Sequence, residues 1–172
     1  MKNKAPAIFL DRDGTINVDY GYVYQIEKLE FLAGADEGLK LLQDAGYILI
    51  IITNQSGVAR GMYSIEQMNE FNMFMKETLQ KMGVEIKKIY TCPHLKGCEC
   101  RKPKLKLFYQ AVEEFNIDLK KSFAIGDKMR DLSICEVEPV KGFLIGNEDV
   151  CKKNVKGCHN LLEAAEKIVE ME

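Results

Sequence analysis

The sequence predicts an α/β fold in which a mostly parallel sheet lies between two layers of helices. Short apolar runs alternate along the chain with longer stretches of helical periodicity, which is typical of such sheets. The run at 48–52 is Ile-Leu-Ile-Ile-Ile and lacks the alternation of a strand with one wet face, so we expect it to be buried on both faces. We therefore expect a Rossmann-like three-layer sandwich without a separate cap domain.

Each expected element has its own signal. The expected strands cover 7–10, 47–52, 88–91, 122–125 and 142–145, and the expected helices cover 35–44, 64–82, 104–115, 130–136 and 160–169. The first helix ends at Ala45-Gly46, because Gly favours the position just after a helix. The second begins at Ser64, whose hydroxyl can cap the backbone three residues later while Gln67 reaches back.

The length and charge of the chain limit what it can be. With 172 residues, 47% of them hydrophobic, it can bury one core but is too short for two ordinary domains. We therefore expect residues 1–172 to form a single domain and to be monomeric. The formal net charge is −2, and Lys, Arg, Asp and Glu are spread along the chain. This distribution argues against a nucleic-acid or membrane partner and favours a small molecule.

The apolar runs and the cysteines bear on location. No stretch approaches the roughly 20 apolar residues that are needed to span a bilayer. Of the six cysteines, three lie with a histidine in the nine residues 92–100, and the chain is large enough to fold without disulfides. We expect a soluble, cytoplasmic protein.

Carboxylates follow two of the predicted strands, where open α/β sheets bind their ligands. Asp11 and Asp13 come directly after the first strand, and Asp127 follows the fourth. Two carboxylates this close repel each other, and such a pair persists where a cation neutralises it. An all-oxygen site suits Mg²⁺, which would also let the anionic Asp11 attack an anionic phosphate.

Donors for the phosphate oxygens follow the other strands. They are the Thr53 hydroxyl, the backbone N–H groups near Asn54, and the Lys102 ammonium. Asp13 can then protonate the leaving oxygen and later deprotonate the attacking water. Each residue alone could be a turn, a cap or a surface charge. Their occurrence in this order, each at a strand end, favours the catalytic interpretation.

The order of these motifs resembles the haloacid dehalogenase superfamily of aspartate-nucleophile phosphatases. The motifs are Asp-x-Asp-Gly-Thr, Thr-Asn after a strand, Lys-Pro, and Gly-Asp with a second Asp downstream. More closely, the chain is similar to the capless bacterial D-glycero-D-manno-heptose 1,7-bisphosphate phosphatases. The matching segments are 11–17, 19–22, 53–61, 92–103 and 126–128, within a resemblance that spans roughly residues 8–132.

This resemblance implies a role for each matching residue. Asp11 would be the nucleophile and Asp13 the acid/base, with Thr53 and Lys102 steadying the phosphoryl group. Mg²⁺ would be held by Asp11, Asp127 and the backbone carbonyl of Asp13. The implied substrate-binding residues are Asp19, Tyr20, Gly21, Tyr22, Asn54, Gln55, Ser56, Arg101 and Lys128. The role of Asp131 stays open between orienting Lys128, orienting a metal-bound water, and direct contact.

A second metal site is expected in the loop 92–100. Cys92, His94, Cys98 and Cys100 supply three thiols and an imidazole, the full ligand count of a closed tetrahedral Zn²⁺ site. With no open position, such a zinc would be structural and would fix the loop that leads into Arg101. The other thiols, Cys135, Cys151 and Cys158, and also His159, are expected to be ordinary core or surface residues.

We therefore expect a Mg²⁺-dependent phosphatase that forms an aspartyl-phosphate, with the 7-phosphate of a heptose 1,7-bisphosphate as its target. The short interval between His94 and Cys98 approaches the related histidinol-phosphate phosphatases, which makes histidinol phosphate the rival substrate. A rival of another class is a receiver-type phosphoacceptor domain, but its phosphorylated Asp has no second Asp two residues later. A catalytically silent, zinc-stabilised binding module is the third alternative.

Overall fold

A seven-stranded sheet forms the centre of the molecule in the order β3-β2-β1-β4-β5-β7-β6, and all neighbouring strands are parallel except β6 and β7. The computed structural model describes residues 3–171. The strands are β1 (Ala7–Leu10), β2 (Ile48–Asn54), β3 (Ile86–Cys92), β4 (Phe123–Gly126), β5 (Lys141–Ile145), β6 (Cys151–Lys152) and β7 (Val155–Cys158). This arrangement confirms the predicted α/β fold with a mostly parallel sheet.

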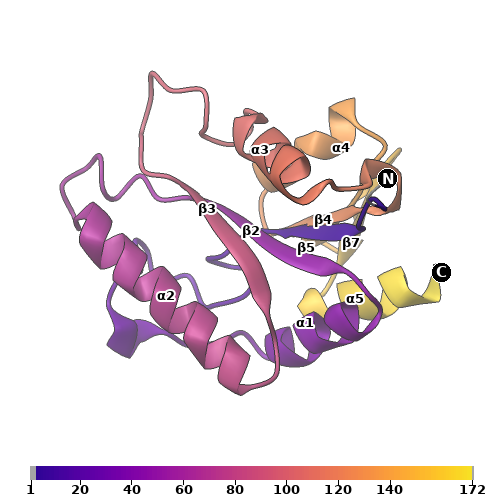
Figure 1. Ribbon diagram of the computed structural model, residues 1–172, viewed down its shortest axis with the longest axis horizontal. Coiled ribbons are helices and arrows are strands. Elements are labelled where there is room, and N and C mark those ends of the chain that lie inside the picture. Colours follow the sequence, from indigo (N-terminus) through magenta and orange to yellow (C-terminus); the bar gives the residue numbers. More distant parts are fainter. Residues whose placement is uncertain (1–2, 172) are drawn as a thin grey trace.

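Helices cover both faces of the sheet (Figure 1). They are α1 (Ala35–Asp44), α2 (Ile65–Lys81), α3 (Lys106–Phe115), α4 (Ile134–Val137) and α5 (Leu161–Glu170). Buried residues of α1, α2 and α5 form one hydrophobic cluster with the sheet, and those of α3 and α4 form another. These two clusters are the two interfaces of a three-layer sandwich.

The run at 48–52 is buried on both faces, as predicted. In β2, Leu49 and Ile51 pack in the cluster under α1, α2 and α5, whereas Ile50 and Ile52 pack in the cluster under α3 and α4. All four side chains are at most 1% exposed. Successive strand residues point to opposite faces, so a strand between two helical layers must be apolar at every position.

Most expected boundaries agree with the structure within two residues. The helix at Ser64 begins with the predicted capping box, because Ser64 Oγ accepts the Gln67 N–H and the Gln67 side chain accepts the Ser64 N–H. The prediction of one helix over 130–136 is wrong in detail. Residues Met129–Leu132 form a 3₁₀ turn and only Ile134–Val137 are α-helical.

The strands β6 and β7 were not predicted from the sequence. Each has four residues or fewer, and β7 contains a glycine, Gly157, so neither carries a clear strand pattern. β7 pairs with β5, which lies earlier in the chain, and β6 pairs only with β7. Gly157 is required by packing, because a Cβ there would lie 1.9 Å from the carbonyl oxygen of Asn147.

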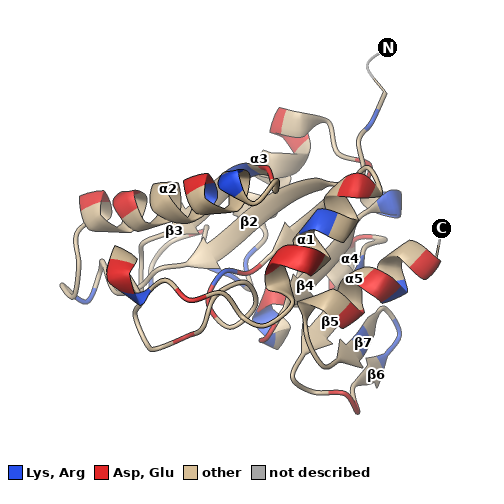
Figure 2. Cartoon of the chain, turned by 90° about the horizontal axis from the view of Figure 1, so that it is seen from below, with Lys and Arg blue, Asp and Glu red and all other residues tan. Residues whose placement is uncertain are grey.

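The carboxyl ends of the parallel strands meet at one edge, which is where the predicted catalytic residues lie. Figure 2 shows Lys and Arg interspersed with Asp and Glu over the helices. Among residues 3–171, no helix combines the length and the apolar character needed to cross a membrane. Residues 1, 2 and 172 of the expected single domain lie outside the described part of the chain.

Candidate active site

The predicted nucleophile lies beside a buried ammonium group. Asp11 directly follows β1, and its Oδ1 accepts a hydrogen bond from Nζ of Lys102 at 2.9 Å. The same Nζ lies 2.8 Å from Oδ1 of Asp131 and also donates to the carbonyl oxygen of Ile52. Lys102 is 2% exposed. These partners fix its ammonium between two carboxylates at the mouth of the sheet.

Burial and neighbouring charges shift the pKa values of this cluster. Burial raises the pKa of Asp11, against the opposing effect of Lys102 and with a further rise from Asp131. Burial alone would lower the pKa of Lys102, but its two carboxylate partners raise it, so the side chain stays protonated. Burial and the nearby Asp11 carboxylate raise the pKa of Asp127 to about 6. A divalent cation would relieve this crowding of negative charge.

The carboxylates in this cluster are suited to Mg²⁺. One oxygen from each of Asp11, Asp127 and Asp131 lies within 4.8 Å of the others. Oδ1 of Asp127 is buried and has no hydrogen-bond partner within residues 3–171, as expected where a ligand completes the site. Gly14 provides the space, because a Cβ there would lie 2.4 Å from Oδ2 of Asp127. Hard oxygen ligands of this kind are those that Mg²⁺ prefers.

The loop that carries Lys102 is tied to the end of β2. Oδ1 of Asn54 accepts the backbone N–H of Lys102 at 3.0 Å, and Nδ2 of Asn54 donates to the Lys102 carbonyl at 3.1 Å. Thr53 precedes Asn54, is 1% exposed, and accepts a hydrogen bond from the Gln55 side chain. The Asn54 side chain at the end of β2 therefore fixes the backbone that carries Lys102.

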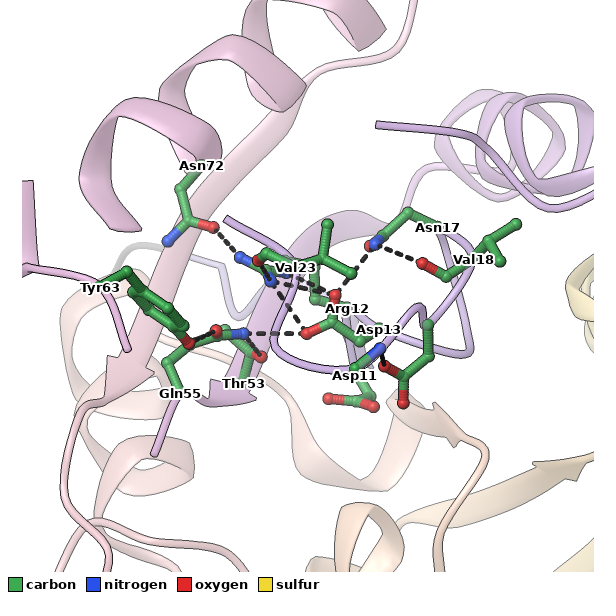
Figure 3. Close-up of polar contacts among 12 residues, drawn as sticks. Asp11, Arg12, Asp13, Asn17, Val18, Val23, Thr53, Gln55, Tyr63 and Asn72 are labelled. Carbon is green, nitrogen blue, oxygen red and sulfur yellow. Dashed lines mark hydrogen bonds and ion pairs between the residues drawn. The ribbon is translucent and has the colours of Figure 1, made fainter. Parts of the chain in front are cut away.

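The second carboxylate of the Asp-x-Asp pair has different partners. Asp13 accepts hydrogen bonds from the side chains of Arg12, Asn17 and Gln55 (Figure 3). An ammonium group faces Asp11, whereas a guanidinium and two amides face Asp13. Such different surroundings are what two carboxylates with separate chemical roles require.

A cavity of about 370 Å³ opens over these residues, and almost every predicted site residue lines it. Those that line it are Asp11, Asp13, Asp19, Gly21, Tyr22, Thr53, Asn54, Gln55, Ser56, Arg101, Lys102, Asp127 and Lys128. Arg60, Tyr63 and Arg130 also line it and were not selected from the sequence. Arg60 and Arg130 each lie in a segment near a strand end that already carried a motif, and this position in the sequence could have identified them as cavity residues.

Tyr20 is the exception among the predicted substrate-binding residues. It is 58% exposed, lines a neighbouring cavity, and donates its hydroxyl to Glu30. The chain turns sharply here, since Gly21 and Tyr22 both have a left-handed backbone and Asp19 Oδ1 accepts the Gly21 N–H. The structure therefore places Tyr20 on the cavity next to the one over Asp11, and a role for it in substrate binding stays a prediction.

Comparison with known proteins gives matches over most of the chain. A family model described as polynucleotide kinase 3 phosphatase matches residues 11–167. The chain is 45% identical over 144 residues to the D-glycero-beta-D-manno-heptose-1,7-bisphosphate 7-phosphatase of Haemophilus ducreyi, covering 78% of this chain and 79% of that protein. It is 42% identical to the D-glycero-alpha-D-manno-heptose-1,7-bisphosphate 7-phosphatase of Campylobacter jejuni, covering 85% of each. The chain belongs to the family of phosphatases that this model and these relatives represent.

The fold of the phosphatase agrees with that of a solved relative. The D,D-heptose 1,7-bisphosphate phosphatase of B. bronchiseptica, solved with magnesium and phosphate, superimposes with a TM-score of 0.87 at 27% identity, covering 97% of this chain and 99% of that one. The expected resemblance to haloacid dehalogenase phosphatases is thereby confirmed.

The four predicted zinc ligands of the phosphatase lie together. Cys92, His94, Cys98 and Cys100 place their ligand atoms within 4.8 Å of one another. The Sγ atoms of Cys92 and Cys98 are 3.7 Å apart, close to the separation of about 3.7 Å that Zn–S bonds of about 2.3 Å give in a tetrahedron. Burial would raise the pKa of Cys98, but backbone N–H groups lower it to about 6, whereas burial raises the pKa of Cys92 to about 12. The thiolate that binds metals is therefore favoured at Cys98. The four residues thus fit a closed zinc site.

Proposed function

We propose that this phosphatase removes the 7-phosphate of D-glycero-D-manno-heptose 1,7-bisphosphate. One observation carries the choice of a bisphosphate: four cationic side chains besides Lys102 line the cavity over Asp11, and we call them the cationic rim. They are Arg60, Arg101, Lys128 and Arg130. Among residues 3–171, no carboxylate lies within 4.0 Å of the three guanidinium groups. Such cations are available for a second phosphate, and the heptose names of the relatives support the sugar.

The reaction follows from the side chains at the strand ends. A carboxylate oxygen of Asp11 bonds to phosphorus while the bond from phosphorus to the sugar oxygen breaks, and Asp13 gives that oxygen a proton. Water then bonds to phosphorus as the Asp11 acyl phosphate bond breaks, and Asp13 takes the proton from the water. Lys102 and Thr53 hold the phosphoryl oxygens in both steps.

Mg²⁺ would be held by Asp11, Asp127 and the backbone carbonyl of Asp13. The ion would screen the repulsion between the Asp11 carboxylate and the phosphate. Asp131 has a different function, because it pairs with Lys102 and its Oδ2 accepts the backbone N–H of Lys128 at 3.0 Å. It holds the ammonium group in place and shapes the turn that presents Lys128.

The zinc site would fix the loop 92–100 next to the substrate cavity. Arg101 follows this loop directly, and its Nη1 donates to the carbonyl oxygen of His94 at 3.4 Å. Zinc would therefore act structurally, within a single phosphatase domain that spans 1–172. We propose a cytoplasmic monomer that acts on small phosphorylated sugars, and the free thiols among the described residues fit a reducing compartment.

A phosphate-release screen tests this proposal. We expect Mg²⁺-dependent release to be fastest, as kcat/KM, from the 1,7-bisphosphate of D-glycero-D-manno-heptose, with both anomers assayed separately. Histidinol phosphate and a 3′-phosphorylated oligonucleotide should be at least about tenfold poorer, since neither places a second phosphate over the cationic rim in the same way. A higher kcat/KM for either of these two would refute the proposed substrate.

The cationic rim can be tested by substitution. We expect Arg60→Ala and Arg130→Ala each to raise the KM for the heptose 1,7-bisphosphate about tenfold, the size of one charge-assisted hydrogen bond. The KM for the 7-monophosphate should change less than about twofold, since that substrate lacks the second phosphate. Lys152→Ala, on the edge strand β6, is the charge-matched control. Equal effects on both substrates would exclude a role in binding the second phosphate.

A further inference from the structure

The carboxylate of Asp13 is held from several sides (Figure 3). Nη2 of Arg12 lies 3.0 Å from Oδ1 and 2.9 Å from Oδ2, and Nε of Arg12 also donates to Oδ1. Nδ2 of Asn17 donates to Oδ1 at 2.9 Å, and Nε2 of Gln55 donates to Oδ2 at 3.0 Å. Both oxygens therefore have directed donors, which leave the carboxylate little freedom to rotate.

Arg12 is itself fixed by the helix α2. It is 0% exposed, so its charge must find all of its partners inside the protein. Nη1 donates to Oδ1 of Asn72 at 2.8 Å, Nη2 donates to the carbonyl oxygen of Val23 at 2.7 Å, and the guanidinium lies 4.5 Å from the centre of the Phe71 ring. Asn72 and Phe71 both lie on α2, a helix to which the sequence motifs assign no function.

Gln55 is oriented in a similar way by Tyr63. The Tyr63 hydroxyl donates to Oε1 of Gln55 at 2.6 Å, and burial raises the pKa of Tyr63 to about 12, so the phenol keeps its proton. Since Oε1 must face this donor, the amide NH₂ must face Thr53 and Asp13. The Tyr63 ring is stacked on Tyr24, with centroids 4.9 Å apart.

We propose that Asn72 and Tyr63 are positioning residues for the reaction. Asn72 holds Arg12, Tyr63 holds Gln55, and the two held side chains fix the Asp13 carboxylate at the cavity. The inference rests on the proposed acid/base role of Asp13. Asn72 bonds to Arg12 and Tyr63 bonds to Gln55 rather than to the reacting atoms, so their effect on the reaction must pass through Asp13.

Leaving-group dependence separates this role from a purely structural one. A sugar alkoxide is a poor leaving group and needs the proton from Asp13, whereas p-nitrophenolate leaves without it. General acid catalysis contributes about 10²–10⁴-fold, and misplacing the acid forfeits part of that. We expect Asn72→Ala and Tyr63→Phe each to lower kcat/KM roughly tenfold or more for a sugar phosphate. For p-nitrophenyl phosphate the loss should stay within about threefold, because departure of this group needs little acid catalysis.

Matched variants control for general damage. Asn69→Ala makes the same change at an exposed position of α2, and Tyr24→Phe removes a hydroxyl from the ring stacked on Tyr63. Both controls should keep the wild-type kcat/KM for both substrates. Tyr63→Phe retains the buried ring, so thermal melts of this variant should show a fold close to wild type even if Asn72→Ala is destabilised.

The decisive experiment combines these variants with Asp13→Asn. If Asn72 and Tyr63 act through Asp13, adding either substitution to Asp13→Asn should leave the residual rate unchanged within about twofold. A further tenfold loss, or equal losses for the sugar phosphate and p-nitrophenyl phosphate, would overturn the proposal. Fructose 1,6-bisphosphate serves as a second primary alkyl phosphate, so the result does not depend on the heptose. An Asp13→Asn variant with full activity would instead refute the acid/base role itself.

Discussion

Asp11→Asn is expected to reduce phosphatase activity on the order of 10⁴-fold or more, with the fold and the zinc site retained. The amide has nearly the shape of the carboxylate but is not a nucleophile toward phosphorus. Lys102 keeps its second carboxylate partner, Asp131, at 2.8 Å, so the buried ammonium group is not left unpaired. The substitution also removes one of three carboxylates that lie within 4.8 Å of one another. Because less repulsion between carboxylates remains, the thermal midpoint of unfolding measured without Mg²⁺ should be at or above that of the wild type.

The measurement is Mg²⁺-dependent phosphate release together with thermal melts and zinc content. Asp13→Asn is the matched control, because it also replaces an acid by its amide two residues away. We expect this variant to form the acyl phosphate from p-nitrophenyl phosphate and to hydrolyse it slowly. Mass spectrometry after acid quenching should then find a phosphoryl adduct on the peptide that carries Asp11. Unchanged activity in Asp11→Asn, or an adduct on another residue, would refute the nucleophile assignment.

The grouping of residues in the candidate active site could be predicted because it depends on local position. Asp11 and Asp127 each follow an apolar strand and Thr53 lies at the end of another, and the carboxyl ends of parallel strands meet at one edge of a sheet. The rule requires only that the strands be recognised and that the sheet be parallel. That the three thiols and His94 lie together was predictable for a similar reason, since they are within nine residues of one another in the sequence.

The residues that the sequence did not identify act through contacts between distant segments. Asn72 reaches Arg12 from a helix sixty residues further along the chain, and no periodicity or motif marks it. Arg12 lies between two motif aspartates, yet a charged residue normally suggests a surface position, and its complete burial depends on partners from three segments. Tyr20 was predicted from a matching segment, and the structure places it on a neighbouring cavity with its hydroxyl bonded to Glu30.

Removal of the zinc ion is expected to have the second largest effect. Beyond the β2–β3 pairing that ends at Cys92, the backbone hydrogen bonds between the loop 92–100 and the rest of the described chain run from Gln55 to Cys92 and from Ala59 to Pro93. The side chains of Arg101 and Lys104 also donate to loop carbonyl oxygens. The metal would therefore supply most of the order in a segment that leads directly into Arg101 and Lys102. Misplacing the Lys102 ammonium removes a charged donor from the phosphoryl group, which costs on the order of 10²–10³-fold in kcat.

Zinc can be removed in two ways, by Cys100→Ser or by extraction with a chelator followed by restoration of Mg²⁺. We expect loss of bound zinc, faster hydrogen exchange in peptides that cover 92–103, and a fall in kcat on the order of 10²-fold for sugar and nitrophenyl phosphates alike. The two substrates respond together here because Lys102 contacts the phosphoryl group that both share. Cys151→Ser, at an exposed thiol outside the cluster, should change neither zinc content nor kcat. A zinc-free enzyme with wild-type kcat would show that the loop is ordered without the metal, and that the contacts of Lys102 with Asn54, Ile52 and Asp131 suffice to hold it beside Asp11.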